Sequence, residues 1–176
     1  MAIKIQYPGV RESIDSDVDN VATLFPDVGP AARELDIKPL LRDAKRQLHD
    51  EADYVREGGY LARYGELLAD APTTGCRNCR DPTTHSVLAM SVVVGVPVES
   101  LVDAPQEERD RVMNLCCLRC CCELFEFRLV QTDPNFANYR YDTDTRQLIL
   151  LDFGATRPSG RPWPASSAGS ERRDQR

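Results

Sequence analysis

The segment QTDPNFANYRYDTDTRQLILLDFGA, residues 131–155, constrains the fold more than any other part of the chain. Its runs NYRYD and RQLILLDF flank the polar turn TDT, and this pattern predicts a β-hairpin. A hairpin brings its outer ends together, so we expect Asn138, at the start of the first strand, to lie beside Asp152, at the end of the second. Because one hairpin is not stable alone, it must pack on the long helix predicted before it.

The polar residues at the mouth of this hairpin are oxygen ligands and acids, which a hairpin itself does not need. An amide oxygen of Asn138 beside the carboxylate of Asp152 suits Mg²⁺, which takes one or two carboxylates together with substrate phosphates. Asp133, five residues before Asn138, is placed to accept a proton from a substrate hydroxyl or to orient the reacting group. A plain turn and a strand end are the alternative, but this order of Asp, Asn and Asp-Phe-Gly around a hairpin is the kinase pattern.

A phosphate-binding lysine on a strand is the second part of a kinase-type site, and a helix glutamate pairs with it. Lys4 lies in the alternating run AIKIQ, which predicts a strand, and Glu57 lies in a predicted helical region. A lysine at a strand edge has no such role by itself. Together with the hairpin pattern, however, the phosphate-binding interpretation of Lys4 is the preferred one.

The remaining elements are predicted from apolar periodicity and chain breakers. In chain order we expect a strand at 2–7, a helix at 10–25, a helical region at 31–70 that breaks near Pro39, a loop at 71–84, a strand buried on both faces at 86–95, a long helix at 104–130 and the hairpin at 138–153. This order of strand, helices, strand, helix and hairpin indicates an α+β fold rather than a doubly wound sheet.

Length and charge exclude several classes of protein. The 176 residues suffice for one domain with a core, and the net charge of −6 argues against a nucleic-acid-binding surface. The longest apolar run, VLAMSVVVGVPV, is shorter than the roughly 20 residues that span a bilayer, so we expect no transmembrane segment. The N-terminus carries no targeting pattern, and the near absence of apolar side chains in residues 158–176 predicts a disordered tail.

The seven cysteines fall into two groups. Cys76 and Cys79 form a C-x-x-C pair in the predicted loop, and the other five lie in the run CCLRCCC of the long helix. Two such groups are compatible with a zinc site, but adjacent cysteines on a helix point away from one another. We therefore prefer buried, reduced thiols, which pack as small apolar side chains, and we assign no role to His49 or His85.

Four collinear segments resemble the UbiB or ADCK family of atypical kinases, in its eukaryotic mitochondrial branch. They are AIKIQYPGVRESIDSDVDNVATLF, EADYVRE, CELFEFRLVQTDPNFANYRYD and LILLDFGATR. The runs KIQYPGV and QTDPNFAN are not general kinase sequences, so the resemblance is specific. It implies that residues 1–157 form an incomplete, partial protein-kinase-like fold, with the lysine strand and helices of the small lobe, the hinge strand, and the long helix and catalytic hairpin of the large lobe.

The resemblance also implies roles for individual residues and a biological setting. The resemblance implies that Lys4 is the phosphate-binding lysine, that Glu57 is its ion-pair partner and that Asp133 is the catalytic-loop aspartate. It implies that Asn138 and Asp152 are metal ligands and that Met90 and Val92 are hinge residues in contact with the nucleotide. It also implies that Glu51 and Asp53 form an acidic pair that faces an N-terminal extension. The implied cofactors are ATP or ADP and Mg²⁺. The implied partners, besides the adenine nucleotide, are a lipid or coenzyme Q precursor and proteins of the biosynthetic complex, in mitochondria.

The chain departs from the family pattern at both ends and at the hinge. It begins at the lysine strand, without the family's Lys-x-Gly-Gln segment or the alanine-rich loop over the nucleotide, and the resemblance stops after Arg157. Ser91 stands where the hinge glutamate is expected. We therefore expect an ATP/Mg²⁺-binding atypical kinase-like ATPase domain of coenzyme Q biosynthesis that is a fragment with impaired activity. The alternative is a catalytically inactive pseudokinase or interaction module that keeps the fold.

Overall fold

The structure, a computed structural model, describes residues 1–24, 37–80 and 83–160. The start of the helical region predicted at 31–70 and most of the predicted tail at 158–176 lie outside the described residues. The elements in chain order are β1 (Ala2–Ile5), α1 (Val10–Leu24), α3 (Lys38–Glu51), α4 (Tyr54–Leu67), β2 (Thr74–Cys76), β3 (Cys79–Arg80), β4 (Val87–Met90), β5 (Val96–Pro97), the 3₁₀ helix η2 (Val98–Asp103), α5 (Gln106–Cys121), the π-helix η3 (Cys122–Phe127), β6 (Leu129–Gln131), the 3₁₀ helix η4 (Phe136–Asn138), β7 (Tyr139–Asp142), β8 (Gln147–Leu150) and β9 (Thr156–Pro158).

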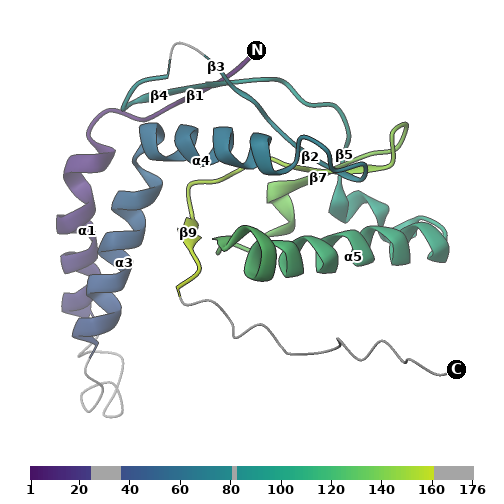
Figure 1. Cartoon of the computed structure of the whole chain (residues 1–176). Helices are drawn as coiled ribbons and strands as arrows, with labels where there is room; N and C mark the ends of the chain where they lie inside the picture. The colour runs from purple at the N-terminus through teal and green to yellow at the C-terminus, as the bar shows by residue number, and fades with distance from the viewer. Residues whose placement is uncertain (25–36, 81–82, 161–176) are drawn as a thin grey trace, which may run out of the picture.

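Helices α1 and α3 pack side by side at one end of the molecule, as Figure 1 shows. Lys45 of α3 forms an ion pair with Asp19 of α1 at 2.7 Å. Pro39 lies in the first turn of α3, which agrees with the break predicted near that residue. The helical region is also divided a second time, because the side chain of Asp53 accepts a hydrogen bond from the backbone nitrogen of Arg56 and so caps a new helix, α4.

The core is built on α4, whose inward residues recur at spacings of three and four. Glu57, Leu61 and Tyr64 are each at most 1 % exposed. Tyr141 of the hairpin and Phe153, which follows it, are also fully buried and belong to the same core. Glu57 is therefore a carboxylate held at the boundary between the core and the sheet that carries Lys4.

Three small sheets surround this core. The first has the order β1–β4–β3, and it is antiparallel, with Lys4 opposite Leu88. The second has the order β2–β8–β7–β5 and contains the predicted hairpin, in which Tyr139 pairs with Leu150. The third pairs β6 with β9. Since β6 immediately precedes the segment that carries Asp133 and β9 follows the Asp-Phe-Gly segment, this pairing holds the two segments together.

The predicted α+β class and the hairpin are confirmed, but three elements differ in extent. The loop predicted at 71–84 contains β2 and β3, which are too short to show a sequence period. The strand predicted at 86–95 ends at Met90, because its partners on both sides pair no further. The long helix predicted to Val130 ends at Phe127, where Arg128 takes a left-handed backbone conformation with φ 52°.

The end of β4 at Met90 also corrects the predicted burial of the following residues. Val92 and Val94 are 64 % and 76 % exposed, although their apolar run predicted a strand buried on both faces. Among the helices that the structure describes, none combines the length and the apolar character needed to cross a membrane.

Candidate nucleotide and metal site

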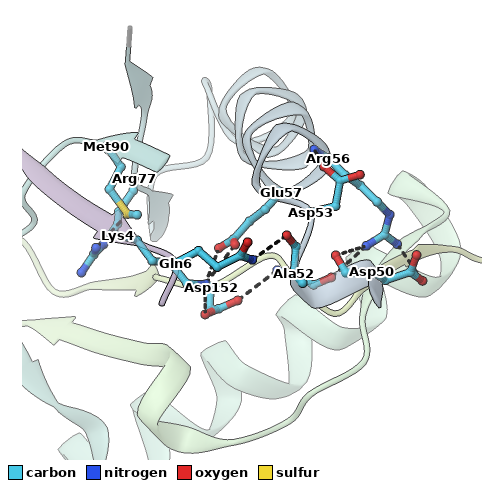
Figure 2. Close-up of polar contacts among 11 residues, drawn as sticks. Lys4, Gln6, Asp50, Ala52, Asp53, Arg56, Glu57, Arg77, Met90 and Asp152 are labelled. Atoms are coloured by element: carbon cyan, nitrogen blue, oxygen red, sulfur yellow. Dashed lines mark hydrogen bonds and ion pairs between the residues drawn. The ribbon is translucent and has the colours of Figure 1, made fainter. Parts of the chain in front are cut away.

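The centre of the candidate site is an ion-pair cluster of Lys4, Glu57 and Asp152. The Lys4 ammonium lies 2.9 Å and 3.2 Å from the two carboxylate oxygens of Glu57 and 3.2 Å from Oδ2 of Asp152. Figure 2 shows these three side chains converging from β1, α4 and the segment after β8. The side chain of Glu57 is 1 % exposed, whereas those of Lys4 and Asp152 are 36 % and 40 % exposed. The cluster therefore has one buried side and one side open to a ligand.

Burial and neighbouring charges shift the pKa values of Lys4 and Glu57. Burial acts to lower the pKa of Lys4, but the carboxylates of Glu57 and Asp152 outweigh it, so that pKa lies above its ordinary value. Burial, followed by the negative charge of Asp152, raises the pKa of Glu57, while Lys4 opposes this shift. Lys4 therefore remains a cation at neutral pH, and it is the group that holds two carboxylates at one point.

The segment predicted to be the catalytic loop follows β6 and is held by hydrogen bonds of its own side chains. The amide nitrogen of Asn138 donates hydrogen bonds to Oδ2 of Asp133 at 2.8 Å and to the carbonyl oxygen of Asp133 at 3.2 Å. The backbone nitrogen of Asp133 donates to Oε1 of Gln131 at 3.0 Å. With its nitrogen directed to Asp133, Asn138 has its amide oxygen left to bind a cation, the atom type that Mg²⁺ prefers.

Two cavities meet at Lys4 and Asp152. The first, of about 370 Å³, is lined by Lys4, Glu57, Arg77, Met90, Asn138 and Asp152, among others. The second, of about 270 Å³, is lined by Lys4, Glu51, Asp133, Asp152, Gly154 and Ala155. The first cavity therefore brings together the predicted phosphate lysine, both predicted metal ligands and one predicted hinge residue. The second places the predicted catalytic aspartate on the other side of Asp152.

Two predicted site residues lie differently. Val92 is largely exposed and lines neither of these cavities, because β4 ends before it. Asp53 uses Oδ1 to cap α4 through the backbone nitrogen of Arg56 at 3.0 Å, whereas Glu51 lines the second cavity. The acidic pair therefore divides into one capping residue and one cavity residue.

Arg56 is a positioning residue that sequence reasoning missed. Its guanidinium donates hydrogen bonds to the carbonyl oxygen of Gly154 at 2.9 Å and to that of Thr156 at 2.6 Å. It also lies 3.6 Å from a carboxylate oxygen of Asp50. Arg56 therefore ties the segment after Asp152 to the junction of α3 and α4. Its position next to Glu57 in the run EADYVRE is the signal that could have identified it.

Phe153 packs on a group of buried polar residues that connects the Asp-Phe-Gly segment to the core. The Phe153 ring lies 4.7 Å from the Tyr64 ring, centroid to centroid. The Tyr64 hydroxyl donates to a carboxylate oxygen of Glu123 and to the carbonyl oxygen of Leu129, both at 2.9 Å. Glu123 also pairs with the buried Arg119. The Asp-Phe-Gly segment is thus anchored to α4 and to the π-helix η3, which precedes the catalytic loop.

The cysteines are less buried than predicted. Cys117, Cys120 and Cys121 are exposed, because they lie on the side of α5 that faces away from the core. Burial raises the pKa of Cys76 and of Cys116 to about 11, which agrees with packed, protonated thiols at those two positions. The side chain of Cys79 lies outside the description. Within the described ranges no three His, Cys, Asp or Glu side chains are grouped so that they could hold a metal ion.

The arrangement as a whole is a partial kinase-like α+β fold. A solved structure with the same fold is that of Rv3197 from Mycobacterium tuberculosis in complex with erythromycin, with a TM-score of 0.71. The match covers 92 % of this chain and 41 % of that one, at 21 % sequence identity, so it bears on the fold alone. Residues 1–161 match the family described as ABC1 atypical kinase-like domain, and the chain belongs to this family. The predicted resemblance to the UbiB or ADCK family is confirmed.

Curated relatives agree with this assignment. The chain is 36 % identical over 166 residues to the mitochondrial atypical kinase coq-8 of Caenorhabditis elegans, covering 92 % of this chain and 22 % of that protein. It is 38 % identical over 161 residues to mitochondrial COQ8B of Rattus norvegicus, covering 91 % and 30 % respectively. For mitochondrial COQ8 of Saccharomyces cerevisiae the identity is 35 % over 159 residues, covering 90 % and 32 %. The chain thus spans less than a third of each relative, and the family resemblance supports the predicted mitochondrial location.

Proposed function

We propose that this chain binds an adenine nucleotide, ATP or ADP, together with Mg²⁺ between β1 and the β7–β8 hairpin. The observation that carries the proposal is the meeting of Lys4, Glu57 and Asp152 at distances of 2.9–3.2 Å on the wall of a cavity that Asn138 also lines. These residues are separated by up to 148 positions in the chain. A core ion pair does not require an amide oxygen and a second carboxylate beside it, whereas a nucleotide–metal site does.

Each residue has a defined task in this proposal. Lys4 contacts the phosphate oxygens, and Glu57 holds its ammonium in place. The amide oxygen of Asn138 and the carboxylate of Asp152 hold Mg²⁺, which when bound neutralises phosphate charge. Asp133 orients an acceptor hydroxyl and takes its proton, and its carboxylate is held for this by the Asn138 amide at 2.8 Å.

The family resemblance extends the proposal to the setting. We infer an atypical kinase-like ATPase of mitochondrial coenzyme Q biosynthesis, with a lipid or coenzyme Q precursor as the acceptor and proteins of the biosynthetic complex as partners. Impaired turnover is part of the proposal, because Val92 and the hinge segment after β4 contribute no described surface to the nucleotide cavity. A pseudokinase that binds nucleotide without turnover is the second candidate, and the same observation favours it.

Thermal unfolding with and without Mg²⁺–ATP tests nucleotide binding. A ligand that binds the folded state alone stabilises it by about 2.7 kcal/mol at a hundredfold excess over Kd. The parent chain should show this stabilisation, and Asp152→Asn should abolish it. Asp144→Asn, which removes an exposed carboxylate at the hairpin turn, is the matched control and should behave like the parent.

The outcomes separate the two candidates. A parent chain whose unfolding is indifferent to Mg²⁺–ATP would show that the site is idle. If binding is present, release of inorganic phosphate from ATP decides between an impaired ATPase and a pseudokinase. Turnover that survives in Asp152→Asn would exclude the proposed metal ligand.

A further inference from the structure

Arg77 lies in the nucleotide cavity although nothing in the sequence pattern or the family resemblance assigns it a role. It follows β2, which pairs in parallel with β8, the strand that leads to Asp152. It precedes β3, which pairs with β4 at Met90. The connection that carries Arg77 thus joins the two walls of the cavity, and its side chain lines that cavity together with Lys4 and Asp152.

The backbone around Arg77 is held firmly against β4. The nitrogen of Asn78 donates to Oγ of Ser91 at 2.9 Å, and the nitrogen of Ser91 donates to the carbonyl oxygen of Asn78 at 3.0 Å. Ser91 is the residue that replaces the expected hinge glutamate. Figure 2 shows Arg77 and Met90 beside Lys4 on one side of the ion-pair cluster, opposite Arg56 and Asp50. The guanidinium is therefore presented to the cavity by a preorganised segment rather than by a flexible surface loop.

Among the described residues, this guanidinium has one hydrogen-bond acceptor, the sulfur of Met90. Nη1 donates to the sulfur of Met90 at 2.9 Å, and a thioether is a weak acceptor. Nε is buried and has no partner in the described part of the chain. No carboxylate of a described residue forms an ion pair with Arg77, in contrast to Lys4, Arg56 and Arg119. A partly buried cation without an anion is unfavourable unless a ligand supplies one.

The electrostatic surroundings also point to an anionic ligand. Burial, and then the positive charge of Arg140, lower the pKa of Arg77, and attraction from Asp152 and Glu57 offsets this incompletely. Within the cavity, two carboxylates face the single ammonium of Lys4 and form ion pairs with it. Arg77 adds a second positive charge to the cavity, and no described carboxylate forms an ion pair with it.

We propose that Arg77 is a second phosphate-binding residue of the nucleotide cavity and donates from its guanidinium to a phosphate oxygen that Lys4 does not hold. This inference rests on the proposed nucleotide site and adds a binding residue to it. The planar guanidinium of an arginine can donate two parallel hydrogen bonds to one phosphate group. A lysine ammonium acts as a point charge and does not form this bidentate contact. Arg77 therefore contributes to the affinity for the phosphorylated nucleotides and not to the affinity for the nucleoside.

Titration calorimetry with Mg²⁺–ATP, Mg²⁺–ADP and adenosine on Arg77→Gln tests this inference. We expect the Kd for ATP and ADP to rise about tenfold or more, as for the loss of a hydrogen bond to a charged group, and the Kd for adenosine to stay unchanged. Arg63→Gln, on the exposed side of α4, removes the same charge away from the cavity and should leave all three values unchanged. Arg77→Lys keeps the charge but loses the fork, and it should fall between parent and Arg77→Gln.

Three results would overturn the inference. An equal loss for adenosine and for the nucleotides would mean that Arg77 shapes the cavity or contacts the base. Parent-like ATP binding in Arg77→Gln would remove Arg77 from the site while leaving the proposed function intact. A parent chain that binds none of the three ligands would refute the proposed function and the inference together. Thermal unfolding of each variant without ligand shows whether the variant is folded. If Arg77→Gln does not fold, the ligand affinities of Arg77→Lys are compared with those of the parent chain instead.

Discussion

At the scale of single residues, the site depends on one ammonium that two carboxylates share. Lys4→Met would leave Glu57 buried without its cation, and we expect a loss of about 2 kcal/mol of unfolding free energy. The value is below that of fully buried pairs because the Lys4 side chain is 36 % exposed. Chemical denaturation measures it, and Lys45→Met, which breaks the more exposed pair with Asp19, should cost less.

The pH dependence of this variant distinguishes a lost charge pair from lost packing. The pKa of Glu57 is already raised by burial and by Asp152, and removing Lys4 takes away an opposing effect. A carboxyl whose pKa is raised in the folded state binds a proton more tightly when folded than when unfolded. Protonation therefore stabilises the fold as pH falls through the folded-state pKa, and at higher pH this stabilisation is absent. The deficit of Lys4→Met should therefore shrink from pH 8 to pH 5.5. A deficit that is constant with pH would assign it to packing.

The thiols of Cys76 and Cys116 provide a second test at this scale. Each has its pKa raised by burial to about 11, from an ordinary value of 9.0. At pH 8 the thiolate fraction of each is then about a hundredfold smaller than that of an ordinary thiol, and the thiolate is the reactive form. Alkylation with iodoacetamide, mapped by mass spectrometry, should label the exposed Cys117 well before either of them. Labelling of Cys76 at the rate of Cys117 would contradict the burial.

At the scale of elements, Arg56 joins α4 to the segment that follows Asp152. Its hydrogen bonds to the carbonyl oxygens of Gly154 and Thr156 involve a charged donor, so Arg56→Gln should cost about 2 kcal/mol of stability. Amide hydrogen exchange should also accelerate in residues 152–156 and much less elsewhere. Arg63→Gln, on the same helix but exposed, is the control and should do neither. Uniform acceleration throughout the chain would mean that Arg56 stabilises the fold and not this segment.

The hairpin was predictable at this scale, whereas the small strands were not. β7 and β8 have enough residues to show alternation around a polar turn, and the proposed metal ligands Asn138 and Asp152 follow from their positions at the ends of the hairpin. β2 and β3 have three and two residues, and no period can be recognised in so few. β2 pairs with β8, far along the chain, and β3 pairs with the neighbouring β4. These partners, and not a sequence period, make the two segments strands.

The residues that the sequence could not reveal are those whose role depends on a distant partner. The pairing of Lys4 with Glu57 was expected from the kinase pattern and the family resemblance, since neither residue signals the other locally. Arg77 has no such pattern, and its proposed role follows from the cavity that it lines. Arg56 lies beside Glu57 in the run EADYVRE, but only the structure shows the carbonyl oxygens to which it donates. Burial after Met90 was mispredicted for the same reason, because an apolar run does not show where its neighbouring strands end.

At the scale of the whole molecule, the first sheet ends in a strand that carries apolar side chains into solvent. β1 is the edge of the sheet β1–β4–β3, and Ile3 and Ile5 are 52 % and 71 % exposed. An exposed, apolar edge strand pairs readily with strands of other molecules. We therefore expect the chain to self-associate, and to do so more at high salt, because salt screens the repulsion from its net charge of −6.

Sedimentation velocity at increasing protein concentration measures this association, and a single charge on the edge strand should oppose it. Ile5→Lys places a lysine on β1, which is how natural edge strands avoid pairing, so it should shift the population towards monomer. Val102→Lys makes the same change at a residue of η2 that is 66 % exposed and lies away from the sheet. If both variants reduce association equally, general solubility and not the β1 edge is responsible. A parent chain that stays monomeric at every concentration and salt level would show that β1 does not pair.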